Sequence, residues 1–267
     1  GHGLSSIKFV EIVKHGKKLK INKFYTIPLP EGALIDDEIQ KPDEILTALK
    51  LGLKKSGIKN TQACIGLSGP GTVTRKLQLA GGDEEDIENQ VIWEAEQYLP
   101  FDIDDSTVSF HIIGENKGGG IDVVIAAAKN EVIENFKGIF LEAGLKVKIV
   151  DLDMIALTNV FEEIMKDKIQ APHNSWAAID FGAQKTLFVI YRDGRIVFTK
   201  EISQGGIMIT EEIQRQMGDN YTEAEDLKTT TDKNGNLPEE IMSVIEEILE
   251  EFFDEIKKDI DFYVTST

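Results

Sequence analysis

The chain has 267 residues and a formal net charge of −18, because 47 acidic residues outnumber 29 lysines and arginines. Its length predicts about two domains at roughly 150 residues each. The acidic charge excludes a broad nucleic-acid-binding surface and disfavours direct adhesion to anionic membranes, since both bind through basic patches. Cys64 is the single cysteine, so no intrachain disulfide can form, and a reducing, cytoplasmic setting fits. No run of 18 apolar residues is present, so we expect no insertion into a membrane.

The charges are distributed unevenly along the chain. Residues 2–30 hold six lysines and one acid, Glu11, whereas residues 211–261 hold 17 acids and five bases. A solvated acidic helical surface is the ordinary explanation of such a run, and an acidic face that meets a basic partner is the alternative.

Apolar periodicity and turn residues predict an alternation of strands and helices over the first 170 residues. The glycine triplet at 118–120 falls between two expected strands and is interpreted as a hairpin loop, although such a triplet can cradle phosphate. Strands are expected over 4–13, 19–28, 62–67, 73–79, 106–113, 121–128 and 145–150. Helices are expected over 43–56, 83–99 and 131–143, and from 151 or 153 onward.

Residues 171–174 (Ala-Pro-His-Asn) are the expected crossing between two domains. Strands are expected beyond it over 176–181, 185–192 and 195–201, the last two forming a hairpin around Asp193-Gly194, and a short helix near 209–217. A final long helix carries an apolar stripe, which indicates a face packed in a core. The stripe consists of Ile241, Val244, Ile245, Ile248, Leu249, Phe252, Phe253 and Ile256.

The two hairpins resemble each other at an offset of 179 residues. Gly3 corresponds to Gly182, and Phe9-Val10 correspond to Phe188-Val189. Two copies of one strand-turn-strand unit indicate a duplicated α/β architecture. Small residues allow successive backbone N–H groups to converge on an anion, so two such turns facing each other across a cleft would clamp a polyphosphate.

The second copy has the more complete set of polar groups. Asp180 ends a buried strand and is followed by the glycine Gly182 and the hydroxyl of Thr186. A carboxylate beside phosphates usually holds Mg²⁺, often through water, so Asp180 is the candidate metal residue. Gly1 stands at the equivalent position of the first copy. The side chains of that copy that suit phosphate are those of Ser5, Ser6 and Lys8.

The paired loops resemble the phosphate loops of the actin/Hsp70/sugar-kinase superfamily, and within it the PilM family of type IV pilus assembly proteins, relatives of FtsA. Residues 93–101 (Trp-Glu-Ala-Glu-Gln-Tyr-Leu-Pro-Phe) are similar to a signature of that family. The resemblance runs in consistent order from Gly3 to about Ser266. Further similar stretches are 151–157, 192–199, Gly205-Gly206 with Thr210, and 223–228.

This resemblance implies an actin-like α/β fold of two duplicated ribonuclease-H-like lobes, with an FtsA/PilM-type inserted subdomain and with truncation at both ends. The first lobe would comprise residues 1–67 and 147–171, and the insertion residues 68–146. The second lobe would comprise residues 172–267 and end in an acidic helical subdomain.

The resemblance also implies roles for individual residues. Glu225 and Lys228 match a pair that contacts the nucleoside, and Gly205-Gly206 would approach the nucleotide through their backbone. Asp153 matches a polar position that handles water or metal, and it is the candidate catalytic residue. The phosphate loops would be lined by Gly3, Ser5, Ser6 and Lys8 in the first copy and by Asp180, Gly182 and Thr186 in the second.

The function implied is that of a nucleotide-binding scaffold that docks the cytoplasmic N-terminal tail of an inner-membrane partner, PilN in this family. It would lie peripherally at the inner membrane through that partner. ATP and Mg²⁺ are expected in the intact parent protein and no ligand in this chain. Alternatives are a weak ATPase or a kinase, an FtsA-like filament subunit and a GspL-like cytoplasmic domain of type II secretion.

Catalysis is the less favoured function, because hydrolysis needs a placed base and a completed metal site. Gly1 occupies the position at which the first phosphate loop would carry an aspartate. The four histidines show no metal-ligand spacing and are interpreted as surface or turn residues. They are His2, His15, His111 and His173.

Overall fold

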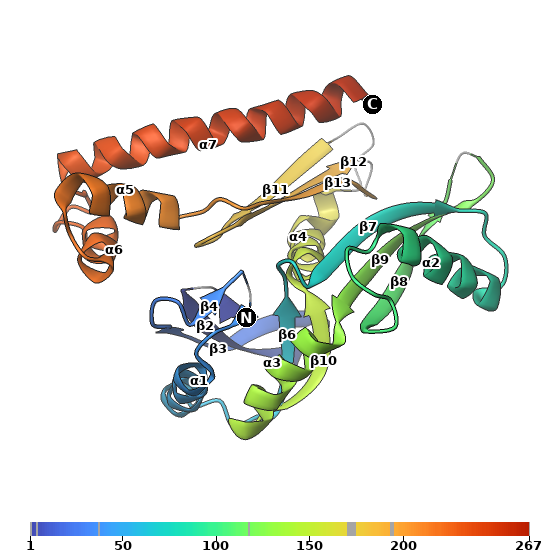
Figure 1. Cartoon of the computed structure of the whole chain (residues 1–267), viewed down its shortest axis with the longest axis horizontal. Coiled ribbons are helices and arrows are strands. Elements are labelled where there is room, and N and C mark those ends of the chain that lie inside the picture. Colours follow the sequence, from blue (N-terminus) through green and yellow to red (C-terminus); the bar gives the residue numbers. More distant parts are fainter. Residues whose placement is uncertain are drawn as a thin grey trace. The chain divides into compact units, whose positions relative to one another are not determined.

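The computed structural model describes residues 2–3, 5–36, 38–116, 118–169, 175–192 and 195–266. The chain divides into two compact units, Gly1–Glu163 and Ile164–Thr267. Figure 1 shows the elements of both units in chain order. The expected crossing at 171–174 and the expected turn at Asp193-Gly194 lie outside the described residues. In the described part of the chain, no helix has the length and apolar character needed to cross a membrane.

Unit 1 contains two small sheets that share one core. One is antiparallel with the strand order β1-β2-β3, and the other pairs β10 with β6 in parallel. Ile7 of the first sheet, Leu67 of the second, Leu49 and Phe136 are buried in the same cluster. The strands are β1 (His2–Gly3), β2 (Ser6–His15), β3 (Lys18–Pro28), β6 (Gln62–Leu67) and β10 (Lys146–Leu152), with the short pair β4 (Leu34–Ile35) and β5 (Glu38–Ile39).

Helices α1 (Pro42–Ser56) and α3 (Asn130–Glu142) pack against these sheets and against each other. The ends of α1 follow from its sequence. Pro42 suits the first turn because its missing N–H would have no helical partner there. Gly57 ends the helix in the left-handed conformation that glycine adopts without strain.

A further sheet in unit 1 has the order β7-β9-β8 and is antiparallel. Helix α2 (Glu84–Tyr98) begins at a capping box formed by Asp83 and Asp86. It buries Val91 against Val123 of this sheet. The strands are β7 (Thr72–Leu79), β8 (Ser106–Glu115) and β9 (Ile121–Lys129).

Unit 2 holds an antiparallel sheet with the order β11-β12-β13 and a set of helices at its C-terminal end. Ile213, Ala224 and Val244 are buried together and join three of these helices in one core. Helix α4 (Asp153–Ile169) runs across the boundary between the units. The remaining elements are β11 (Ser175–Phe181), β12 (Thr186–Arg192), β13 (Arg195–Ile202), α5 (Ile207–Met217), α6 (Tyr221–Thr229) and α7 (Glu239–Ser266).

The internal repeat is present in the structure as one strand register in two separate sheets. Phe181 pairs with Thr186 between β11 and β12, and His2 pairs with Ile7 between β1 and β2. Both residues of the first pair lie 179 positions after those of the second. The hairpins of the two copies therefore belong to different units and are built in the same way.

The structure contains elements that the sequence analysis did not name, among them the strand pair β4–β5 and helix α6. Helix α7, expected as a long final helix, runs to Ser266, ten residues beyond the last residue of its apolar stripe, Ile256. Helix α6 was not among the expected elements, because it has little apolar periodicity: Ala224 is the one buried residue among its nine. Its start is set by a capping box between Asn220 and Glu223.

We expect Gly52→Ala to destabilise unit 1, because a Cβ there would overlap the ring of Phe9, which is buried. Overpacking of this kind costs about 1–3 kcal/mol in the free energy of unfolding, which chemical denaturation followed by circular dichroism measures. Gly138→Ala in α3 is the matched control, since nothing lies within 4 Å of its added Cβ. That variant should gain about 0.5–1 kcal/mol. Equal stabilities would contradict the packing of α1 on β2.

Candidate functional site

The turn between β11 and β12 and the segment before α5 form one packed backbone structure in unit 2. The Gly182 N–H donates to the Lys185 carbonyl at 2.9 Å and closes the turn. The N–H groups of Gly206 and Ile207 donate to the carbonyls of Gly182 and Ala183 at 2.9 and 2.7 Å. The expected second phosphate loop and the expected glycine pair are therefore in direct contact.

Position 205 requires glycine because the contact leaves no room for a Cβ atom. A Cβ added there would lie 2.5 Å from the Gly182 carbonyl oxygen and 2.8 Å from the carbonyl of Ala183. Both are backbone atoms, which cannot move aside as a flexible side chain can. At Gly206 the nearest atoms to an added Cβ are 3.7 Å away or more, an ordinary contact distance. Position 206 therefore has room for a Cβ atom, whereas position 205 does not.

Asp180 and Thr186 flank the turn and have different surroundings. Asp180 is exposed near the end of β11, opposite Leu187 of β12. Thr186 is fully buried, and its hydroxyl donates to the Gln204 carbonyl at 2.9 Å. Thr186 thereby holds the turn to the segment that contains Gly205.

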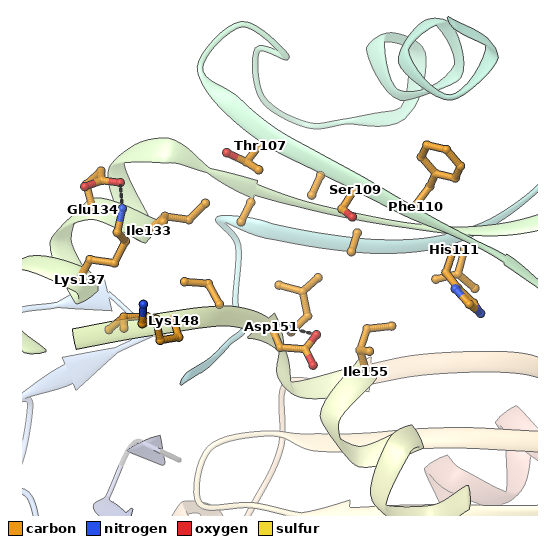
Figure 2. A pocket seen from close by; sticks show the side chains of 17 residues that line it. Thr107, Ser109, Phe110, His111, Ile133, Glu134, Lys137, Lys148, Asp151 and Ile155 are labelled. Carbon is orange, nitrogen blue, oxygen red and sulfur yellow. Dashed lines mark hydrogen bonds and ion pairs between the residues drawn. The ribbon is translucent and has the colours of Figure 1, made fainter. Parts of the chain in front are cut away.

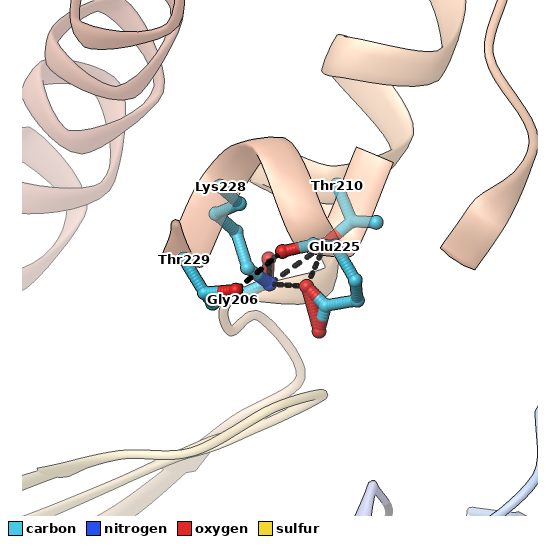
Figure 3. A network of polar contacts seen from close by, with 5 residues as sticks. All are labelled: Gly206, Thr210, Glu225, Lys228 and Thr229. Atoms are coloured by element: carbon cyan, nitrogen blue, oxygen red, sulfur yellow. Dashed lines mark hydrogen bonds and ion pairs between the residues drawn. The ribbon is translucent and has the colours of Figure 1, made fainter. Parts of the chain in front are cut away.

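A polar network joins the start of α5 to α6 within unit 2 (Figure 3). The Lys228 ammonium donates to the Thr210 hydroxyl at 2.7 Å and to the Gly206 carbonyl at 3.2 Å, and it forms an ion pair with Glu225. The Thr210 hydroxyl lies 3.1 Å from Oε2 of Glu225, the atom that also pairs with Lys228. The Lys228 side chain is 16% exposed and that of Glu225 31%, so the carboxylate is the more accessible group.

Polar residues of unit 1 gather at two places. Gly3 pairs with Ser6 where β1 turns into β2, and the Ser5 carbonyl accepts a hydrogen bond from the Leu29 N–H at 2.9 Å. Lys8 follows two residues after Ser6 along β2 and is exposed. The expected first phosphate loop is thus a short turn between two paired strands.

Asp153 lies at the start of α4, beside the end of β6. Its Oδ2 accepts a hydrogen bond from the buried Ser68 hydroxyl at 2.8 Å. Its Oδ1 lies over Gly66, where an added Cβ would overlap it. The sequence singled out Asp153 but did not name either residue as its partner; Gly66 belongs to β6 and Ser68 directly follows that strand.

Unit 1 also contains a groove of about 580 Å³. The family resemblance implies a groove between the main part of the first lobe and its insertion, without naming the residues that line it. Figure 2 shows side chains of β8, among them Ser109 and His111, across the groove from Lys148 and Asp151 of β10 and Ile155 of α4. Thr107 and Ser109 of β8 and three successive alanines of β9 also line it, and all five residues are small. The alanines are Ala126, Ala127 and Ala128.

Some of the charged side chains at the groove have partners within the protein. Lys137 pairs with Glu134 at 2.6 Å on α3, and Asp151 accepts a hydrogen bond from the Leu152 N–H at 2.8 Å. Within the described ranges, no cluster of three or more histidine, cysteine or acidic side chains is placed to hold a metal ion. The groove therefore combines small and apolar residues with a few polar side chains.

Comparison with solved structures assigns the fold. A PilM–PilN type IV pilus biogenesis complex superposes with a TM-score of 0.84 at 23% identity, covering 98% of this chain and 75% of the other. The ethanolamine utilization protein EutJ of Carboxydothermus hydrogenoformans gives 0.53 at 14% identity, covering 97% and 69%. The fold is therefore of the actin-like α/β class.

The family follows from the sequence of nearly the whole chain. A family model described as type IV pilus assembly protein PilM matches residues 2–267. The chain belongs to the PilM family of type IV pilus assembly proteins.

We expect Gly205→Ala to destabilise unit 2 by about 1–3 kcal/mol, because the added Cβ would press on backbone carbonyls of the turn after β11. Gly206→Ala is the matched control and should cost only a few tenths of a kcal/mol, since alanine is a poorer helix N-cap than glycine. Denaturant unfolding compares the two variants. A loss at position 206 as large as that at 205 would contradict this account.

Proposed function

We propose that this PilM family member is a scaffold whose unit 1 groove takes up the cytoplasmic N-terminal tail of an inner-membrane partner of the PilN type. The observation that carries the proposal is the groove of about 580 Å³ between β8 and β10. The family and the solved complex described as PilM–PilN support this class of partner.

The groove has the features that an extended peptide needs. Among the described strands, β8 pairs with β9 alone and β10 with β6 alone, so each has one edge open to a further strand. A peptide that adds to such an edge gains main-chain hydrogen bonds, and pockets for alternate side chains give specificity. Val124, Val150 and Ile155 would contact apolar side chains of the tail.

Attachment to the membrane is indirect in this proposal. The net charge of −18 opposes adsorption to anionic lipid, and the partner supplies the membrane anchor. The protein would then lie peripherally at the cytoplasmic face of the inner membrane.

We further propose that unit 2 contributes to a site for Mg-ATP in the full-length protein. Glu225 makes its network contacts through Oε2, which leaves Oε1 to accept hydrogen bonds from ribose hydroxyls. Lys228 holds Glu225, Thr210 and Gly206 in one arrangement and so positions that carboxylate. Gly182, Thr186 and Gly205 fix the turn on which Asp180 stands.

Bound Mg-ATP would supply a polyphosphate and a hard cation to these groups. Asp180 would hold Mg²⁺ through water, with phosphate oxygens completing its ligands. Gly3, Ser5, Ser6 and Lys8 would form the first phosphate loop, and Asp153 would handle water or metal. Binding, without turnover, is the function proposed, and an ATPase assay distinguishes it from the enzymatic alternative.

We expect Ser109→Trp to weaken binding of a synthetic peptide from the partner's cytoplasmic N-terminus by at least about tenfold, or about 1.4 kcal/mol. The indole would fill the groove from an exposed position of β8, so the fold should persist. Ser109→Ala is the matched control and should bind as the parent does. Calorimetry measures both.

Two outcomes would contradict the scaffold proposal. One is the absence of peptide binding by the parent chain at tens of micromolar. The other is flotation of the chain with anionic liposomes in the absence of partner, which would indicate direct membrane binding.

We expect Lys228→Ala to abolish the increase in melting temperature that Mg-ATP gives the full-length protein. Ligand at about 100 times its dissociation constant adds about 2.7 kcal/mol of stability, which a melting curve resolves. Lys233→Ala removes the same charge from an exposed loop outside the network and should leave the shift unchanged. An unchanged shift in Lys228→Ala would place the nucleotide elsewhere.

A further inference from the structure

The end of the β2–β3 hairpin is basic, although the chain as a whole is acidic. We call residues 12–21 the hairpin tip. They hold four lysines and no acid, in a chain whose net charge is −18. Every residue of the hairpin tip is exposed. The lysines are Lys14, Lys17, Lys18 and Lys20.

Apolar side chains gather on one side of the hairpin tip. Ile12 is opposite Ile21 in the strand register, and Lys14 is opposite Leu19. Paired residues, and residues two apart on one strand, point to the same side of a sheet, so these four side chains share one face. The three apolar side chains are 59–63% exposed. The face therefore offers apolar surface beside lysines.

The outward side of α2 also carries exposed apolar side chains. The helix buries Ile87, Val91 and Ala95 against its sheet. Ile92 and Trp93 point elsewhere and are 46% and 59% exposed. Tryptophan is the side chain most often found as an anchor at protein interfaces, so this pair is a candidate contact surface.

Acidic side chains flank this apolar pair. Glu88 lies one turn before Ile92 and Glu96 one turn after it, and both are exposed. The helix holds six acids and no lysine or arginine. None of these acids forms an ion pair with another described residue. We call Glu88, Ile92, Trp93 and Glu96 the outer face of α2.

The hairpin tip and the outer face of α2 match in length as well as in charge. Residues 12–15 of a strand cover about 10 Å, and the two turns of helix from Glu88 to Glu96 cover about 12 Å. A hairpin laid along the helix can therefore place its apolar face on the apolar pair while its lysines reach both acids. Within unit 1 the hairpin lies apart from α2 (Figure 1), so the two surfaces are available to different molecules.

We propose that the hairpin tip of one copy of this chain docks on the outer face of α2 of a second copy. Lysines of the tip pair with Glu88 and Glu96, and the apolar face of the tip covers Trp93. The contact joins two different surfaces, so each pair of copies keeps one free hairpin tip and one free α2 face. A contact of this size is weak and transient. It uses neither the groove of unit 1 nor the polar network of unit 2.

Salt distinguishes this contact from the general repulsion between two acidic molecules. The Debye length is about 10 Å at 0.1 M salt and about 3 Å at 1 M. At 0.1 M, repulsion between distant charges is already screened, whereas lysine–glutamate pairs in direct contact lose strength above that concentration. We expect the self-association measured by sedimentation equilibrium at 0.1 M salt to weaken at least about tenfold at 1 M.

Charge reversal on either surface should prevent association, and mixing the two variants should restore it. The tip variant carries Lys18→Glu and Lys20→Glu, and the helix variant carries Glu88→Lys and Glu96→Lys. We expect each alone to associate at least about tenfold more weakly than the parent, because like charges then meet. An equimolar mixture combines one unaltered tip with one unaltered α2 face and should form pairs of unlike copies. A variant that had failed to fold could not restore association in this way.

A third variant reverses charges on α7, which is also acidic. Glu250→Lys and Asp254→Lys lie beside Phe253, an aromatic side chain that is 56% exposed. The variant has the same charge change as the helix variant on a different helix, so it should associate as the parent does.

Tryptophan fluorescence locates the contact. The chain has two tryptophans, and Trp176→Phe leaves Trp93 as the sole one. We expect the emission of Trp93 to shift to shorter wavelength as the protein concentration rises at 0.1 M salt, because docking removes an exposed indole from water. The shift should be absent in the same background with the substitutions of the tip variant.

A parent chain that stays monomeric at 0.1 M salt would overturn the proposal. Association that persists in the helix variant but is lost in the α7 variant would show that α7 receives the tip, and would overturn it too. So would flotation with anionic liposomes that the parent shows and the tip variant lacks, since a lipid surface would then be the occupant. Binding of the partner peptide should be equal in all variants. Its absence would bear on the groove and leave this inference unaffected.

Discussion

The backbone contact between Gly205 and the turn after β11 is the constraint on which the polar arrangement of unit 2 depends. It holds the turn against the start of α5, through hydrogen bonds from the Gly206 and Ile207 N–H groups. The position of α5 then fixes Thr210, against which Lys228 of α6 is held. A glycine at 205 is thus explained by packing alone, whether or not a ligand also approaches it.

The sequence predicted most of the regular elements of the fold. Strand 62–67 was predicted with the bounds that β6 has, and helix 43–56 differs from α1 by one residue, because apolar periodicity, Pro42 and Gly57 mark these elements locally. The offset of the repeat also matches the strand registers. Helix α6 escaped notice because it contributes little apolar surface, and its capping box was the available signal.

A groove between the main part of the first lobe and its insertion is implied by the family resemblance, but its lining could not be predicted in the same way. Its walls come from five elements that are distant in sequence, and none of its residues is unusual for its type of element. Small residues on β9, such as Ala126, were the one local hint, since a strand with small side chains leaves space above it. The residues named for nucleotide remain predictions, although the structure brings Gly206, Glu225 and Lys228 together.

The groove lies in the compact unit Gly1–Glu163, whereas the Glu225–Lys228 network lies in Ile164–Thr267. Each can therefore be altered by substitutions that leave the packing of the other untouched. This separation is what allows Ser109→Trp and Lys228→Ala to be assigned to one site each.

The Asp153 carboxylate occupies the space that a side chain at position 66 would need, so two positions far apart in the sequence depend on each other. Any side chain at 66 would displace the carboxylate and with it the hydrogen bond from Ser68. The residue at either position therefore restricts which substitutions the other position can accept during evolution. In aligned relatives, residues 66 and 153 should vary as a pair, and a chain with a bulky residue at 66 should carry a shorter side chain at 153.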